Sequence, residues 1–170
     1  MVLREGLFIG TCVFLAVLFE LTLLSRLGIP GATPDIVVVS IVAISFAAGP
    51  LLGAIAGFAA GILLDFSPSS DTLVGVNAIL YLIIGFTAGF WLDPRDRKLP
   101  VMIGIAALST AGAAFGTAVV DTVLGGERVN WTEVPWITLS AALYGALLSA
   151  LIIPLVARLA RTLLTEISVS

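Results

Sequence analysis

Long apolar stretches with almost no charge, separated by short polar links, constrain this chain more than any motif. The first stretch runs from Gly6 to Leu24 and contains a single charged residue, Glu20. Backbone polar groups in a lipid bilayer must be hydrogen-bonded within the protein, so apolar stretches of this length cross membranes as helices. Only 11% of the residues are charged, against roughly 25% in ordinary soluble domains. We therefore expect an integral membrane protein.

The predicted fold is an all-α compact bundle of six transmembrane helices in a single domain, residues 1–170. The predicted spans are 6–24, 35–48, 50–64, 74–92, 100–124 and 135–164. Gly49 and Pro50 interrupt the apolar stretch from Ile36 to Leu64. One helix of that length would measure about 45 Å, too long for a hydrocarbon core of about 30 Å. The second and third helices are therefore either two short spans or a re-entrant hairpin.

The basic residues predict the orientation. With six spans, or four spans and a hairpin, six of the eight basic residues lie on one side: Arg4, Arg95, Arg97, Lys98, Arg158 and Arg161. Arg26 and Arg128 lie on the other side. The positive-inside rule then places both termini and the link 93–98 in the cytoplasm. We reject a five-span arrangement, because it would place this basic link outside.

Glycine recurs at every fourth position in the third predicted span. Gly49, Gly53, Gly57 and Gly61 lie on one helix face and precede Asp65. Membrane helices associate through close van der Waals contact, which faces of small residues permit. These glycines, with Gly85 and Gly89 in the fourth span, are therefore candidate helix-packing residues. The neighbour is either a partner's helix or another helix of this chain.

The same topology gathers the acidic residues on the outer side: Glu20, Asp35, Asp65, Asp71, Asp121, Glu127 and Glu133. A bare carboxylate within the membrane costs on the order of 2 to 3 kcal/mol, so Glu20 needs a proton or a partner. Asp65 ends its helix, where the dipole disfavours a negative charge. Arg26, a free helix N-terminus or a partner protein could hold it.

Glu20, Asp35 and Asp121 are candidate structural acids. Asp35 follows Thr33 and Pro34, which together are typical of a helix start. One interpretation is that the acids are interfacial, solvated or paired within the fold. The alternative is that they mark the place where a ligand or partner docks.

Several kinds of chemistry have no residues to support them. The chain contains no histidine and one cysteine, Cys12, which excludes disulfides, histidine bases and almost every transition-metal site. Asp65 and Asp121 lie in no nucleophile motif, and the single lysine is the cytoplasmic Lys98. We expect no catalytic residues, no cofactor and no bound metal. A net charge of −3 excludes a nucleic-acid partner.

A sequence of features carries a family resemblance. Pro34 and Asp35 start a short apolar helix, residues 57–65 read GFAAGILLD, and after a short polar loop VGVNA opens the next span at Val74. With the length and the basic link before the fifth span, this arrangement resembles the MreD family of rod shape-determining proteins. The resemblance implies a non-catalytic scaffold or regulator in the bacterial inner membrane, a multi-pass protein that helps control peptidoglycan synthesis and cell shape.

The partners that the resemblance implies are membrane lipid and MreC, a single-span protein with a large extracytoplasmic domain. A wall transpeptidase, a polytopic glycosyltransferase and the actin-like MreB are further implied partners. We call Gly49, Gly53, Gly57 and Gly61 the glycine ladder. We expect the glycine ladder to bind the transmembrane helix of the MreC-like protein, unless the ladder packs internally.

The resemblance also implies a fold similar to the substrate-binding subunits of energy-coupling-factor vitamin transporters, which are six-helix bundles. A subunit of this kind is the alternative function. Such subunits couple to their partner through small residues of the first helix, where this chain offers Gly6 and Gly10. A third interpretation is a structural homo-oligomer that associates through the same glycines.

Overall fold

The computed structural model describes residues 2–22, 31–67, 74–91, 98–125 and 129–164. These residues form six helices and no strand: α1 Val2–Thr22, α2 Ile36–Ala48, α3 Pro50–Asp65, α4 Val76–Trp91, α5 Leu99–Val123 and α6 Val134–Leu164. Every helix end lies within four residues of the end predicted for it. The all-α prediction is therefore confirmed. Predictions for Arg26, Asp71, Arg95, Arg97, Glu127 and Arg128 lie outside the described residues.

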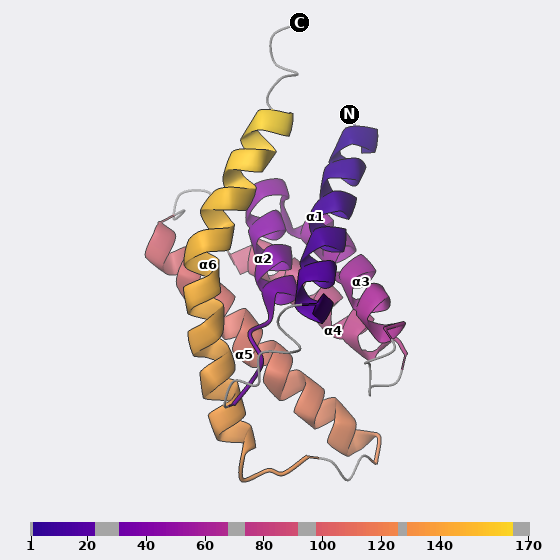
Figure 1. The fold of residues 1–170 in the computed structure, drawn as a ribbon, viewed down its shortest axis with the longest axis vertical. Helices are drawn as coiled ribbons and strands as arrows, with labels where there is room; N and C mark the ends of the chain where they lie inside the picture. Colours follow the sequence, from indigo (N-terminus) through magenta and orange to yellow (C-terminus); the bar gives the residue numbers. More distant parts are fainter. Residues whose placement is uncertain (1, 23–30, 68–73, 92–97, 126–128, 165–170) are drawn as a thin grey trace, which may run out of the picture.

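Helix α2 lies at the centre of the bundle and contacts all five other helices (Figure 1). Its sequence, IVVVSIVAISFAA, has no polar face, and ten of its thirteen residues are buried. A helix that is apolar all round is stable where every side is covered. Helices α3 and α4 pair on one side of α2, and α5 and α6 form a second pair.

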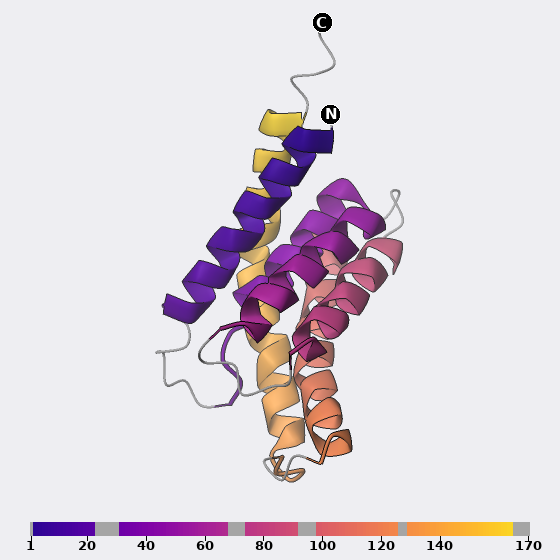
Figure 2. The same cartoon turned by 90° about the vertical axis from the view of Figure 1, so that its right-hand side faces the viewer.

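Successive helices run in opposite directions (Figures 1 and 2). Both termini, the end of α4 and the start of α5 therefore lie at one end of the molecule, which we call the terminal end. The far end carries the ends of α1, α3 and α5 and the starts of α2, α4 and α6. The α5–α6 pair extends beyond the shorter helices at the far end (Figure 2).

Gly49 and Pro50 form the predicted break between α2 and α3. Gly49 adopts a φ of 95°, a backbone conformation that glycine reaches without a steric penalty. Its N–H donates to the Ser45 carbonyl oxygen at 2.9 Å and ends α2. Pro50 then occupies the first turn of α3, where a missing N–H costs nothing. The stretch 36–65 is thus a helix–turn–helix with arms of 13 and 16 residues.

The glycine ladder packs inside the molecule. A Cβ added to Gly57 would collide with the Tyr81 carbonyl, and one added to Gly61 would collide with the Ala78 backbone. A Cβ on Gly53 would lie 2.7 Å from the carbonyl oxygen of Gly85. The ladder is therefore occupied by α4, which is the internal alternative left open by the sequence.

Gly49 and Gly89 have other surroundings. Gly49 makes the turn, and a Cβ there would meet nothing within 4 Å. A Cβ on Gly89 would lie 2.7 Å from the Pro50 Cα, so the end of α4 packs on the start of α3. Gly85 faces Gly53 across the same interface. Together these contacts hold α3 and α4 antiparallel along their whole length.

Hydroxyl groups add polar contacts between helices. The Ser45 hydroxyl donates to the Gly85 carbonyl oxygen at 2.6 Å, which joins α2 to α4. The Thr110 hydroxyl donates to the Ala141 carbonyl oxygen at 3.0 Å, which joins α5 to α6, and a Cβ on Gly145 would collide with Thr110. Interhelical hydrogen bonds of this kind contribute about 0.6 kcal/mol each in membrane bundles.

Two helices are long and apolar enough to cross a membrane by length and composition: Leu99–Val123 and Val134–Ala160. The apolar parts of α1 to α4 are shorter: Gly6–Thr22, Ile36–Ala48, Pro50–Asp65 and Val76–Trp91. The two long helices, α5 and α6, weakly suggest association with a membrane.

Replacing Gly57 with alanine tests the backbone contact between α3 and α4. The added methyl group meets backbone atoms, which cannot rotate away, so the helices must separate. We expect a loss of about 2 kcal/mol or more of unfolding free energy, measured by thermal unfolding in detergent. Gly104→Ala is the matched control, because a Cβ there meets nothing within 4 Å. Equal stability of the two variants would contradict this packing.

Candidate functional site

Asp65 is buried at the end of α3 and caps the start of α4. Its carboxylate accepts hydrogen bonds from the backbone N–H groups of Gly75 at 2.8 Å, Ala78 at 3.2 Å and Asn77 at 3.3 Å. The first N–H groups of a helix have no partner within it and carry the positive end of its dipole. A helix N-terminus, one of the three partners that the sequence left open, therefore holds Asp65, while Arg26 lies outside the described residues.

Glu20 and Asp35 together cap α2. The Val38 N–H donates to Asp35 Oδ1 at 2.7 Å, as in an ordinary N-cap. The Val37 N–H donates to Glu20 Oε2 at 3.0 Å, which ties the end of α1 to the start of α2. The Tyr81 hydroxyl donates to Asp35 Oδ2 at 3.0 Å and brings α4 into the same cluster.

These contacts favour the structural interpretation of the three acids. Glu20, Asp35 and Asp65 accept hydrogen bonds from backbone N–H groups at the starts of α2 and α4. A carboxylate used in this way stabilises a helix terminus instead of presenting a reactive group. Over the described ranges, no three His, Cys, Asp or Glu side chains lie close enough together to hold a metal ion.

Asp121 does not join this cluster. It lies on α5, half-buried, and makes no hydrogen bond or ion pair with any residue that the structure describes. The sequence grouped it with Glu20 and Asp35 because all three fall near the outer ends of predicted spans. The α5–α6 pair extends beyond the shorter helices at that end, so Asp121, near the end of α5, lies apart from the starts of α2 and α4 (Figure 2).

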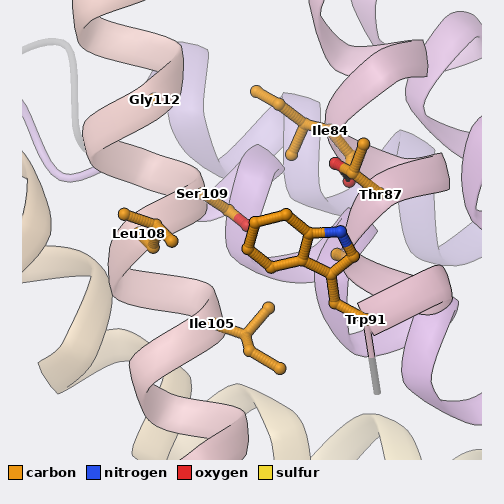
Figure 3. A pocket seen from close by; sticks show the side chains of 8 residues that line it. Ile84, Thr87, Trp91, Ile105, Leu108, Ser109 and Gly112 are labelled. Atoms are coloured by element: carbon orange, nitrogen blue, oxygen red, sulfur yellow. Dashed lines mark hydrogen bonds between the residues drawn. The ribbon is translucent and has the colours of Figure 1, made fainter. Parts of the chain in front are cut away.

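A hollow of about 200 Å³ lies between α4 and α5 (Figure 3). We call it the α4–α5 groove. It is open along one side, and its lining is mostly apolar: Ile84, Thr87, Ala88 and Trp91 from α4, and Ile105, Leu108, Ser109 and Gly112 from α5. The Ser109 hydroxyl and the Trp91 ring point toward one another across it (Figure 3).

The two hydroxyl groups of the groove differ in their bonding. The Thr87 hydroxyl donates to the Ile83 carbonyl oxygen of its own helix at 2.8 Å. The Ser109 hydroxyl has no hydrogen-bond partner among the residues that the structure describes. The groove therefore offers one free donor and acceptor in an otherwise apolar lining.

The groove exists because the buried face of α5 packs mainly on α6. The buried residues of α5 are Ala106, Thr110 and Ala113. Thr110 meets α6, and the opposite face of α5 leaves Gly104 and Gly112 without a neighbour within 4 Å of a built Cβ. Sequence reasoning missed this site. Its signal is the eight-residue spacing of Gly104 and Gly112, with Ser109 between them.

Comparison with known proteins found no matching family model, no similar curated protein and no similar solved structure.

Removing the Asp65 carboxylate tests its capping role. Asp65→Ala leaves the N–H groups of Gly75, Asn77 and Ala78 without their acceptor in a buried place. We expect a loss of about 2 kcal/mol of unfolding free energy, and a smaller loss for Asp65→Asn, which keeps one acceptor oxygen. Asp121→Ala is the control, with an expected change within about 0.5 kcal/mol. Thermal unfolding in detergent measures all three, and equal effects at Asp65 and Asp121 would rule out the cap.

Proposed function

We propose that this chain is a non-catalytic scaffold of the bacterial inner membrane that binds the transmembrane helix of a single-span, MreC-like protein. Through this binding it would help to control peptidoglycan synthesis and cell shape. The observation that carries the proposal is the α4–α5 groove, a lateral hollow beside open glycines. The resemblance to the MreD family supplies the identity of the partner.

The exposed surface supports a membrane location for all six helices. Large apolar side chains on every helix except the central α2 are exposed, among them Phe14, Leu51, Phe90, Leu108 and Leu151, with exposed fractions between 58% and 71%. A water-soluble protein rarely exposes contiguous apolar patches on this scale. A bundle surrounded by lipid requires them, because lipid tails are as apolar as leucine.

The packing of α3 on α4 favours two short spans over a re-entrant hairpin. Pro50, at the start of α3, contacts Gly89 near the end of α4, and Asp65, at the end of α3, caps the start of α4. The two helices are therefore coextensive. If α4 crosses the membrane, α3 crosses it too, and α2, which precedes α3 in the chain, runs antiparallel to it.

Charge supports the orientation. The described ends of α1, α4, α5 and α6 at the terminal end adjoin the sequence positions of six of the eight basic residues. The far end carries Glu20, Asp35, Asp65 and Asp121. By the positive-inside rule the terminal end faces the cytoplasm. An extracytoplasmic domain of the partner would then stand over the acidic end, and MreB would lie at the terminal end.

The α4–α5 groove is a better candidate than the glycine ladder for binding a helix of the partner. Ala88, Ser109 and Gly112 are small, so another backbone can approach closely, as membrane helix association requires. The glycine ladder of α3 cannot serve this purpose, because α4 already occupies it. The contact proposed here therefore differs from the one expected from the ladder. A wall transpeptidase and glycosyltransferase would join through the same partner.

The alternative, a vitamin-binding transporter subunit, receives less support. Small-molecule sites usually bury most of the ligand and fix it with several polar groups. The α4–α5 groove opens sideways, and its free polar group is the Ser109 hydroxyl.

A pull-down of the detergent-solubilised protein from its native membrane tests the proposal. We expect MreC and the wall synthases among the proteins identified by mass spectrometry. Recovery of an energy-coupling module with its ATPases, without MreC, would overturn the scaffold function.

Filling the groove tests the site. We expect Gly112→Leu and Ser109→Leu each to reduce recovery of the MreC-like protein at least tenfold, since the added side chain blocks backbone approach. Ala59→Leu, on the exposed face of α3 outside the groove, should bind normally. Thermal unfolding of each variant separates lost binding from lost folding. Unchanged recovery with the folded groove variants would exclude the groove as the contact.

A further inference from the structure

The outward face of the α3–α4 pair is apolar from end to end. We call it the short face. It includes Leu51, Ile55 and Phe58 of α3 and Leu82, Phe86 and Phe90 of α4, with exposed fractions from 37% to 71%. The Phe86 and Phe90 rings stack with their centroids 6.2 Å apart.

The side chains of the short face indicate what covers it. The glycines of α3 and α4 are turned inward against each other, and the outward positions are mainly bulky aliphatic and aromatic residues. Close packing of another helix needs small residues that let the backbones approach. Fluid acyl chains need no such match, because they conform to an irregular apolar surface. The short face is therefore built for lipid.

The short face is lower than the hydrocarbon core of a typical bilayer is thick. The described helices α3 and α4 have 16 residues each, about 24 Å, and they contact each other near both ends. The hydrocarbon core of a typical bilayer is about 30 Å thick. Helix α5 has 25 residues, about 37 Å. The apolar surface is thus low on one side of the bundle and tall on the other.

Long and short helices adapt to a membrane in different ways. A long helix can tilt, and α5 crosses the molecule obliquely (Figure 1). A helix that is too short cannot lengthen, and tilting makes it shorter still. A short span is accommodated by thinning of the bilayer, by snorkelling of flanking side chains or by oligomerisation, and the bulky short face favours thinning over close packing on another copy.

We propose that the short face is a lipid-binding surface that selects short acyl chains and thins the bilayer beside α3 and α4 to about 24 Å. The inference rests on the membrane location in the proposed function and is independent of any protein partner. It assigns the two long sides of the molecule different lipid neighbours, with ordinary bilayer along α5 and α6.

Reconstitution in bilayers of graded thickness tests this inference. The full chain is placed in vesicles of monounsaturated phosphatidylcholine with 14, 16, 18 or 22 carbons per acyl chain. Its thermal unfolding is followed by loss of helical circular dichroism. We expect the highest unfolding temperature with 14 or 16 carbons, and a value several degrees lower with 22 carbons. A maximum at 18 carbons or more, or no dependence on chain length, would overturn the proposal.

Cross-linking distinguishes lipid from a second copy of the chain. Phe58→Cys, made with Cys12→Ala so that no other thiol is present, places one cysteine on the short face. With lipid on this face, we expect no disulfide dimer in 14-carbon or 16-carbon vesicles under oxidation. Efficient dimer formation in those vesicles would overturn the lipid assignment. Ala59→Cys in the same background checks the neighbouring exposed position.

The bilayer-thickness experiment and the pull-down of the MreC-like protein can fail independently of each other. Failure to recover an MreC-like protein together with a short-chain optimum would leave the short face assigned to lipid. Recovery of that protein together with a flat thickness profile would overturn the lipid inference alone.

Discussion

Direct backbone contact between α3 and α4 is the interaction on which the rest of the structure depends. Gly53 meets Gly85, Gly57 meets the Tyr81 backbone, and Gly61 meets the Ala78 backbone. This closeness brings Asp65 within hydrogen-bonding reach of the first amides of α4. It also leaves α2 to fill the centre of the bundle. The bulky residues of α3 and α4 are then turned outward, which determines what the pair can touch.

The buried Asp65 and the half-buried Glu20 and Asp35 also serve the packing of the helices. An uncompensated charge in an apolar interior is costly, and so is a helix start without acceptors for its N–H groups. Glu20, Asp35 and Asp65 reduce both costs by accepting hydrogen bonds from those N–H groups. The acids of this end are therefore explained by architecture, and a proposal for function has to rest on another place. The α4–α5 groove is that place, because there small residues and a free hydroxyl are left over after the bundle has packed.

Much of the fold could be predicted from the sequence, because it follows from local properties. Apolar length predicts the six helices, and Gly49 with Pro50 predicts the break between α2 and α3. The need of Asp65 for a compensating partner follows from its position at a helix end. The choice among its three possible partners could not be predicted, since the donors lie on another helix. For the same reason, the four-residue spacing of the glycine ladder predicts a face of α3 that another helix can approach closely, but it does not predict which helix packs there. The groove was missed because it depends on how α4 and α5 are placed relative to each other, which neither helix sequence states alone.

The capping bonds of Glu20 and Asp65 share a feature with a consequence for biosynthesis. Each carboxylate stands at the end of one helix and binds the first amides of the next helix in the chain, 17 residues on for Glu20 and 10 to 13 residues on for Asp65. Closing loops of this size costs little chain entropy. Both acids can therefore find their donors as soon as the following helix begins to emerge from the ribosome. The α1–α2 and α3–α4 hairpins can each be fastened before the remainder of the polypeptide exists.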